Sequence, residues 1–173
     1  MQRIFALLLF LLVSPILLLI MLIVVLFEWK TPVFVQDRIG RMQQTFTIYK
    51  LRTMKNGRIT LLGRIFRKTG IDELPQLINI LKGDMNFVGP RPLTKEDIVR
   101  LKWDGESQLR RWSVKPGITG MAQLVNVCDA NVSWNADMEY ISNRSVKLDL
   151  KIIWKSMLVP ILGKSNVKQH IHK

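Results

Sequence analysis

Cysteine is almost absent from this chain of 173 residues, which carries only Cys128. A single cysteine excludes an internal disulfide and fits a reducing compartment. Because no histidine stands near Cys128 in the sequence, the thiol lacks an activating base, and we expect it to be structural or incidental. Histidine is also scarce, and the spacing of His170 and His172 in a basic tail is weak support for a metal site.

Two hallmarks of nucleotide-binding folds are missing. The chain has no Gly-rich phosphate loop, and its segments do not alternate in the βαβ order of a doubly wound sheet. Any bound phosphate must therefore be held by side chains, helix termini and metal. No internal repeat or linker is visible, and residues 31–173 have the size of one ordinary domain.

Acidic residues are half as frequent as basic ones. Thirteen Asp and Glu stand against 26 Lys and Arg, which gives a net charge of +13 and a pI of about 10.3. Such a charge suits anionic lipid, a nucleotide diphosphate or nucleic acid, and charge alone does not choose among them.

The N-terminus holds an apolar run from Ile4 to Phe27. At about 1.5 Å per residue it is long enough to cross a hydrocarbon core of about 30 Å. Ser14 and Pro15 stand near its middle, where proline removes a hydrogen bond and kinks a helix. Two interpretations follow, a kinked transmembrane helix or a re-entrant helix that returns to the side from which it entered. Basic residues beyond both ends, Arg3 and Lys30, favour two cytoplasmic ends and therefore the re-entrant form.

The remaining pattern predicts a helix-dominated α+β domain with a short β-hairpin. Val33 to Val35 and Thr45 to Leu51 read as two strands around a turn at Gly40. Near the C-terminus, apolar residues form a stripe on the side of a predicted helix opposite Lys151 and Lys155. Such a helix can lie in a bilayer surface or pack on a globular core. The stripe consists of Leu150, Ile153, Trp154, Met157, Leu158 and Ile161. Trp29, just past the first apolar run, stands where interfacial aromatic residues collect.

Asp72 and Glu73 are adjacent carboxylates at a predicted helix start. Apolar residues recur behind them at helical spacing, Pro75 suits a first turn, and Gly83 closes the helix. The simplest interpretation of such a pair is a helix N-cap. The alternative is catalysis on a phosphate, since cations that would neutralise its charge stand on both sides. These cations are Arg64, Arg67, Lys68 and Arg91.

Arg91 is constrained by its neighbours in the sequence. Pro90 and Pro92 fix φ on either side of it and leave its backbone little freedom. A guanidinium fork suits bidentate contact with phosphate.

Five sequence blocks follow one another in the chain: PVFVQDRIG (32–40), YKLRTM (49–54), RITLLGRIFRKTGIDELPQL (58–77), LKGDMNFVGPRPL (81–93) and KPGITGMAQ (115–123). In this order they resemble the bacterial sugar transferases, the monotopic phosphoglycosyl transferase superfamily. The resemblance covers Arg3 to about Gly163.

The resemblance implies a reaction and a cofactor. Family members transfer a sugar 1-phosphate from a UDP-sugar to undecaprenyl phosphate, release UMP through a covalent aspartyl phosphosugar, and thereby start a surface glycan. They use Mg²⁺, for which Asp72 and Glu73 would be the ligands. Carried over by position, Asp72 would be the nucleophile and Glu73 its partner. The residues implied to bind substrate or phosphate are Lys50, Arg52, Arg67, Arg91 and Gln123.

The resemblance also implies location and partners. Residues 1–30 would form a re-entrant membrane helix broken at Ser14-Pro15, and residues 31–173 a cytoplasmic catalytic domain with amphipathic interfacial helices, on the cytoplasmic face of a bacterial inner membrane. Anionic lipid is the expected surface, and downstream glycosyltransferases are further candidate partners. The ending Leu162-Gly163-Lys164 resembles that of relatives that use N-acetylated amino sugars. However, a basic residue that many relatives place after Gln123 is missing, which leaves the sugar open.

Two rival functions explain part of the sequence. A non-catalytic basic membrane protein that binds anionic lipid or scaffolds glycan-assembly enzymes accounts for the charge and both apolar segments without needing Asp72. Nucleic-acid binding accounts only for the charge, and the apolar N-terminus argues against it. We therefore expect no nucleic-acid partner.

Overall fold

The computed structural model describes residues 2–28, 31–125 and 129–162. Residues considered above that lie outside these ranges are Trp29, Lys30, Cys128, Gly163, Lys164, His170 and His172. The chain divides into two compact units. Unit 1 comprises Met1–Asp37 and Thr47–Gly83, and unit 2 comprises Arg38–Phe46 and Asp84–Lys173.

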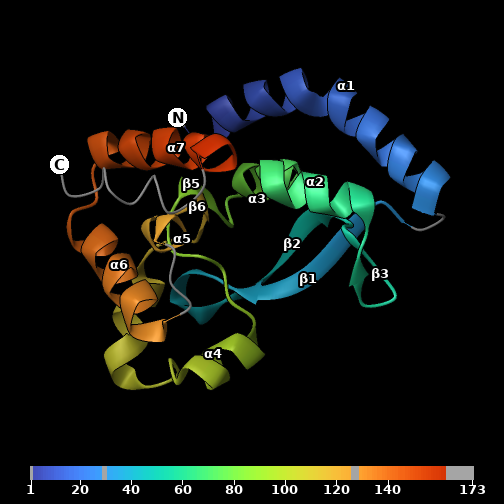
Figure 1. Ribbon diagram of the computed structural model, residues 1–173. Helices are drawn as coiled ribbons and strands as arrows, with labels where there is room; N and C mark the ends of the chain where they lie inside the picture. The colour runs from blue at the N-terminus through green and yellow to red at the C-terminus, as the bar shows by residue number, and fades with distance from the viewer. Residues whose placement is uncertain (1, 29–30, 126–128, 163–173) are drawn as a thin grey trace. The chain divides into compact units, whose positions relative to one another are not determined.

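The described residues form short strands between helices (Figure 1). Up to Gly83 the elements are α1 (Gln2–Glu28), β1 (Val33–Ile39), the 3₁₀ helix η1 (Arg41–Gln43), β2 (Thr45–Leu51), β3 (Met54–Lys55), β4 (Arg58–Ile59), α2 (Leu61–Thr69), the 3₁₀ helix η2 (Ile71–Gln76) and α3 (Leu77–Lys82). Beyond it they are β5 (Asn86–Val88), α4 (Lys95–Leu101), the 3₁₀ helix η3 (Glu106–Ser113), β6 (Gly117–Thr119), α5 (Met121–Leu124), α6 (Ala130–Ser142) and α7 (Val146–Leu162). The predicted helix-dominated α+β class is confirmed, and β1 pairs with β2 around a turn that includes Gly40.

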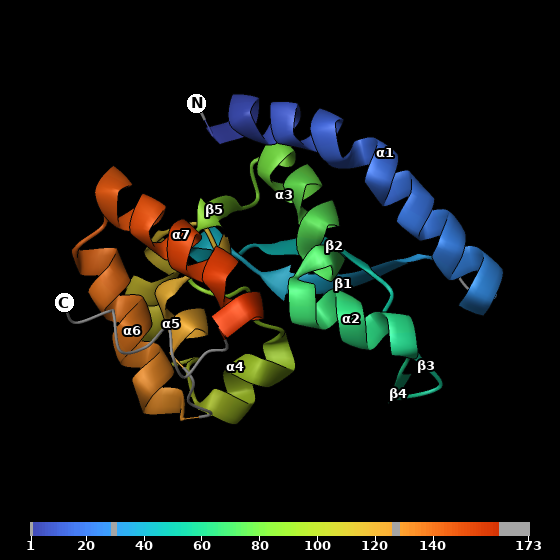
Figure 2. The same cartoon turned by 45° about the horizontal axis from the view of Figure 1, so that its top comes forward.

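The predicted break at Ser14-Pro15 is wrong: helix α1 is continuous through both residues and bends near its middle (Figures 1 and 2). Proline at position 15 has no N–H to donate to the carbonyl of Leu11, four residues earlier. The Ser14 hydroxyl donates to that carbonyl at 2.9 Å and replaces the lost bond. The Ser-Pro pair therefore bends the helix without leaving the Leu11 carbonyl unpaired, as an apolar environment requires.

The first unit is organised around α1. Leu17 and Val24 of α1 are buried against Leu51 of β2 and Phe66 of α2. At its N-terminal end, Arg3 donates from Nη2 to the carbonyl of Lys82 at 3.4 Å, at the end of α3. Most of the other large side chains of α1 are exposed, and α1 is long and apolar enough to cross a membrane.

The helix predicted to follow Asp72 starts differently from the expectation. Residues Ile71–Gln76 wind as a 3₁₀ turn, and the α-helix proper begins at Leu77. The cause is Pro75, whose ring would clash with the carbonyl four residues earlier in an α-helix. Gly83 closes α3 in the left-handed conformation at φ +91°, as predicted.

Unit 2 brings together two loops that the sequence pattern left separate. Strand β5 pairs in parallel with β6, and the Gly117 N–H also donates to the Pro90 carbonyl at 3.0 Å, in the loop after Val88. A Cβ on Gly117 would overlap the backbone of Gly89, so this close approach requires glycine. One core of the unit joins Val88 and Met121 to residues of α6 and α7, including Tyr140 and Ile152.

Helix α7 carries apolar side chains on two faces. Ile152 is buried, and Lys155, which the sequence pattern placed on the polar face, is also buried at 8% exposure. The opposite side exposes Leu150, Trp154 and Met157, with Trp154 65% exposed. The predicted polar face is thus wrong for Lys155, because the helix is rotated to pack Ile152 and Lys155 inward. The apolar stripe is split between the core and the surface.

One glycine fixes how closely α2 approaches the strands. A Cβ on Gly63 would overlap the carbonyl oxygen of Thr53, and Gly63 is buried. Gly63→Ala is expected to destabilise the fold by about 1–3 kcal/mol, although alanine favours helix more than glycine does. Thermal or urea unfolding in detergent measures this.

The matched control is Arg64→Ala on the exposed side of the same helix, which is expected to shift stability by less than about 0.5 kcal/mol. A Gly63→Ala variant as stable as the parent would show that α2 can move away from Thr53 without loss.

Candidate active site

Asp72 and Glu73 lie in the first turn of η2, in unit 1. Gly70, at φ +76°, ends α2 and starts this turn, and the Glu73 N–H donates to the Gly70 carbonyl at 3.1 Å. Both carboxylates are half-buried. The N-cap position belongs to Gly70, so the structure does not give these carboxylates the N-cap role of the simpler interpretation.

Lys50 reaches the carboxylate pair from β2. Its Nζ donates to Glu73 Oε1 at 2.7 Å, and the two side chains are 19% and 26% exposed. At this partial burial the ion pair is screened less than a surface pair. The structure thus brings Lys50 and Glu73 together from positions 23 residues apart, and a role for Lys50 in substrate binding stays a prediction.

Asn79 aligns the strand that carries Lys50. Its side chain is fully buried, donates to the Thr47 carbonyl at 2.7 Å and accepts from the Tyr49 N–H at 3.3 Å. The side chain acts as a strand partner for β2 and ties it to α3. Asn79 is not among the residues predicted from the sequence. The available signal was a polar residue inside the apolar run Leu77–Leu81.

The predicted arginines of unit 1 have different surroundings. Arg67 is exposed, and its Nε donates to Thr53 Oγ1 at 2.9 Å. Its charge also acts on Asp72. Arg52 donates instead to the carbonyl and hydroxyl of Thr31, at 2.8 and 3.0 Å, and so secures the chain after α1. A role for Arg52 in substrate binding stays a prediction.

Asp72 has a perturbed acidity. Burial raises its pKa above the ordinary value, the neighbouring Glu73 charge raises it further, and Lys50 and Arg67 partly offset the rise. A half-buried carboxylate held next to a second one needs nearby cations to stay ionised. Perturbed groups of this kind are typical of functional sites.

Arg91 and Gln123 belong to unit 2. Arg91 is exposed in the turn between Pro90 and Pro92. Gln123 lies on α5 and donates from Nε2 to the Ile118 carbonyl at 3.1 Å. Its Oε1 is buried and has no hydrogen-bond partner among the described residues, which leaves an acceptor for a ligand hydroxyl or amide.

The carboxylate pair fits a magnesium ion. Mg²⁺ takes oxygen ligands and is commonly held by one or two carboxylates together with substrate phosphates and water. Across residues 2–28, 31–125 and 129–162, no group of three or more His, Cys, Asp or Glu side chains is placed to hold a metal. Asp72 and Glu73 are two adjacent carboxylates of the type that could hold Mg²⁺ together with a substrate phosphate.

Comparison with known proteins shows similarity to sugar transferases, both to a family model and to individual relatives. The family model described as bacterial sugar transferase matches residues 1–163. The chain is 41% identical over 155 residues to an uncharacterized sugar transferase, EpsL, of Bacillus subtilis, covering 81% of this chain and 75% of the relative.

Two longer relatives carry more specific names. The UDP-N-acetylgalactosamine-undecaprenyl-phosphate N-acetylgalactosaminephosphotransferase of Aeromonas hydrophila is 34% identical and covers 80% of this chain. The UDP-glucose:undecaprenyl-phosphate glucose-1-phosphate transferase of Escherichia coli is 33% identical and covers 91%. This chain spans only 38% and 39% of their lengths.

The raised pKa of Asp72 predicts a pH-dependent effect of removing its charge. Because the carboxylate is harder to ionise in the folded chain than in the unfolded chain, its ionisation opposes folding, and stability falls as pH rises through the folded pKa. Asp72→Asn is therefore expected to raise the Tm at pH 7. The difference should shrink as the pH falls below about 4, where aspartate becomes increasingly neutral in both states.

Thermal unfolding of both proteins at pH 7 and at about pH 3.5 tests this. The exposed Asp104, changed to asparagine, serves as control and is expected to alter the Tm little at either pH. A lower Tm for Asp72→Asn at pH 7 would instead make Asp72 a stabilising residue of the helix start.

Proposed function

The chain belongs to the bacterial sugar transferase family, and from that premise we propose that it is a phosphoglycosyl transferase. It would move a sugar 1-phosphate from a UDP-sugar to undecaprenyl phosphate, release UMP and so begin a surface glycan. The names of the Aeromonas hydrophila and Escherichia coli relatives, both sugar phosphotransferases that act on undecaprenyl phosphate, support this reaction class.

One observation of this chain carries the proposal: the half-buried Asp72 and Glu73 stand beside Lys50 and Arg67. Lys50 forms an ion pair with Glu73, while the charges of both cations act on Asp72. A carboxylate would ordinarily repel a phosphate, so neighbouring cations are the condition for bringing the two together. The rival membrane scaffold needs no such arrangement.

The proposed chemistry has two displacements at one phosphorus atom. A carboxylate oxygen of Asp72 attacks the β-phosphorus of the UDP-sugar, and the bond from that phosphorus to the bridging oxygen breaks, so UMP leaves with that oxygen. A phosphate oxygen of undecaprenyl phosphate then attacks the same phosphorus, and the bond to Asp72 breaks. Splitting the transfer in this way replaces one difficult step by two easier ones.

The other residues would stabilise charge and orient the substrates. Magnesium, when bound by Asp72 and Glu73 together with the diphosphate, would neutralise part of the phosphate charge. Lys50 holds Glu73 in place, and Arg67 lies near enough to act on Asp72 electrostatically. We assign phosphate contact to the exposed guanidinium of Arg91 and substrate contact to the buried Oε1 of Gln123.

We further propose that α1 is a re-entrant helix on the cytoplasmic face of a bacterial inner membrane. The bend at Ser14-Pro15 supports this. It is compatible with an apolar environment, because the Leu11 carbonyl stays hydrogen-bonded. The contacts of α1 support it too. Arg3 near its start and Val24 near its end both contact residues of unit 1, as expected of a helix whose two ends stay on one side.

The exposed apolar face of α7 would lie in the membrane interface. Leu150, Trp154 and Met157 are each at least 62% exposed, and Lys147 and Lys151 are exposed beside them. Exposed apolar side chains with neighbouring lysines are typical of helices that lie on anionic lipid.

The reaction is tested by Asp72→Asn, which keeps the size of the side chain but cannot attack phosphorus. UMP release from a panel of UDP-sugars with undecaprenyl phosphate is expected to fall by at least about a thousandfold. With UDP-sugar alone, the unaltered protein should accumulate a phosphosugar on Asp72, detectable by mass spectrometry. The panel also identifies the sugar, with N-acetylated amino sugars as our first candidates.

Asp104→Asn is the control and should retain full activity, because Asp104 is exposed and lies outside the proposed site. Near-normal turnover in Asp72→Asn would reject Asp72 as nucleophile. No UMP release from the unaltered protein with any UDP-sugar would favour the membrane scaffold.

Topology is tested by tags at the N-terminus and after Lys173. Both tags should be shielded from a membrane-impermeant reagent added to spheroplasts. Pro15→Leu restores a continuous backbone hydrogen-bond pattern and should expose the N-terminal tag in part of the population, whereas the neighbouring Ile16→Leu should not. Labelling of the N-terminal tag in the unaltered chain would show a spanning helix.

A further inference from the structure

The turn Pro90-Arg91-Pro92 is held through its carbonyl groups. The Pro90 carbonyl accepts from the Gly117 N–H at 3.0 Å, the Arg91 carbonyl from Arg111 Nη2 at 2.8 Å, and the Pro92 carbonyl from Arg38 Nη1 at 3.4 Å. Since proline has no N–H, carbonyls supply most of the points at which this backbone can be fixed. Three successive carbonyls are thus bound from three separate segments of unit 2.

Arg111 is the more deeply buried of the two arginine donors. Its side chain and that of Asp137 are each 2% exposed, and Arg111 Nε donates to Asp137 Oδ2 at 2.8 Å. The guanidinium also lies over the rings of Trp103 and Trp112, at 5.1 and 4.9 Å from their centroids. Asp137, Trp103 and Trp112 leave the guanidinium little freedom to move, so its Nη2 is held on the Arg91 carbonyl.

Stability alone does not account for this buried pair. Removing two charges from water costs about as much as their attraction returns, so a well-packed apolar pair of similar volume would stabilise a fold equally well or better. What an apolar pair could not provide is a donor to the Arg91 carbonyl.

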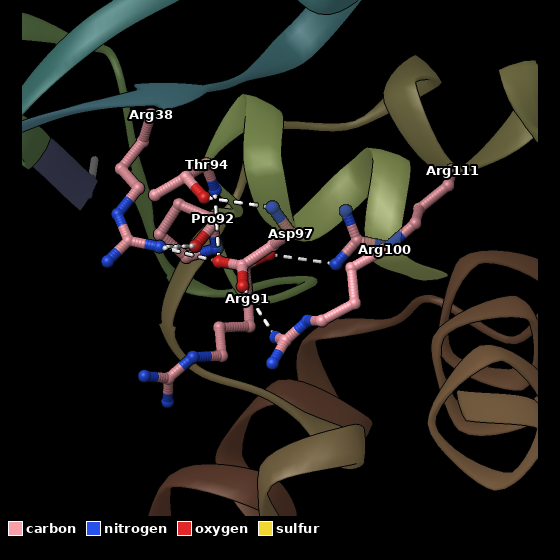
Figure 3. A network of polar contacts seen from close by, with 7 residues as sticks. All are labelled: Arg38, Arg91, Pro92, Thr94, Asp97, Arg100 and Arg111. Carbon is pink, nitrogen blue, oxygen red and sulfur yellow. Dashed lines mark hydrogen bonds and ion pairs between the residues drawn. The ribbon is translucent and has the colours of Figure 1, made fainter. Parts of the chain in front are cut away.

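The held backbone presents a free side chain. Figure 3 shows the Arg91 guanidinium extending away from the polar contacts that fix its own main chain, and the residue is exposed. Arg38, which binds the next carbonyl, is held by Asp97 at 3.3 Å, and the charge of Arg91 contributes to lowering the Arg38 pKa after burial. The two positive charges repel each other, so the contacts of the Arg91 main chain have to hold this residue beside Arg38.

From these contacts we infer that Arg111, held by Asp137, is a positioning residue that orients Arg91 for a diphosphate. The inference rests on the proposed function, which gives Arg91 its phosphate. It assigns Arg111 no contact with the substrate. Lysine cannot replace Arg111, because one ammonium group cannot donate to the Asp137 carboxylate and the Arg91 carbonyl with the fixed geometry of a guanidinium.

The test is a double-mutant cycle on equilibrium binding of UDP with magnesium chloride, measured by calorimetry in detergent. The four proteins are the unaltered chain, Arg111→Lys, Arg91→Ala and the double variant. Arg111→Lys is expected to weaken UDP binding about tenfold when Arg91 is present, because a displaced side chain loses its geometry. In the Arg91→Ala background the same change should have less than about a twofold effect, since Arg111 acts through Arg91.

Arg110→Lys is the matched control. Arg110 precedes Arg111 in the same 3₁₀ helix and donates to Ser142 Oγ at 3.0 Å, away from the turn. It should leave UDP binding unchanged. A second variant, Arg111→Met with Asp137→Leu, removes both charges together and is expected to keep the parent Tm within a few degrees while losing the same UDP affinity as Arg111→Lys.

An equal loss from Arg111→Lys in both Arg91 backgrounds would overturn the inference and leave Arg111 a structural residue. Parent-like UDP affinity in the folded apolar pair variant, or no UDP binding by the unaltered chain, would overturn it as well. The proposed function fails separately: a chain that binds UDP, shows the predicted coupling and yet releases no UMP from any UDP-sugar would keep the positioning role and lose the reaction.

Discussion

Packing of α1 against the segment that carries the carboxylates is the constraint on which the rest of unit 1 depends. Ile71 and Leu74, on either side of Asp72 and Glu73, pack against the same core as Leu17 and Val24 of α1. Ile71 and Leu74 thereby connect the segment of the two acidic side chains to the apolar helix α1. For the proposed reaction, this arrangement places the proposed nucleophile beside the apolar helix α1.

Charge in unit 1 is organised by backbone contacts. Asn79 fixes β2 against α3, and Lys50 of β2 then meets Glu73. Gly63 permits the close approach of α2 to Thr53, and Arg67, one turn later, bonds the Thr53 hydroxyl. In both cases a buried residue sets the position of a cation. The net charge of +13 shows that cations are abundant in the chain. The contacts of Asn79 and Gly63 help to place two of them, Lys50 and Arg67, near Asp72.

In unit 2, hydrogen bonds to the main chain fix the turn that carries Arg91. Proline on both sides of Arg91 limits its backbone, and three donors from separate segments bind the carbonyls of that turn. The parallel pair β5–β6 brings Gly117 to the turn, and a buried guanidinium supplies a second donor. Rigid main chain with an exposed, unencumbered side chain is what phosphate recognition by arginine requires, because a guanidinium fork binds through geometry as well as charge.

The sequence by itself determined the class of fold, the apolar helix with its Ser-Pro bend, the strands around Gly40, the end of α3 at Gly83 and the residue types of the candidate site, because these depend on local periodicity, turn chemistry and ordered motifs. It did not determine the 3₁₀ start at Ile71, the inward face of Lys155, the β5–β6 pair, or the roles of Asn79 and of Arg111 with Asp137. Those features depend on which surfaces meet. Partners such as Arg111 and Asp137 are 26 residues apart, and only the packing of distant segments decides which buried polar group finds which partner.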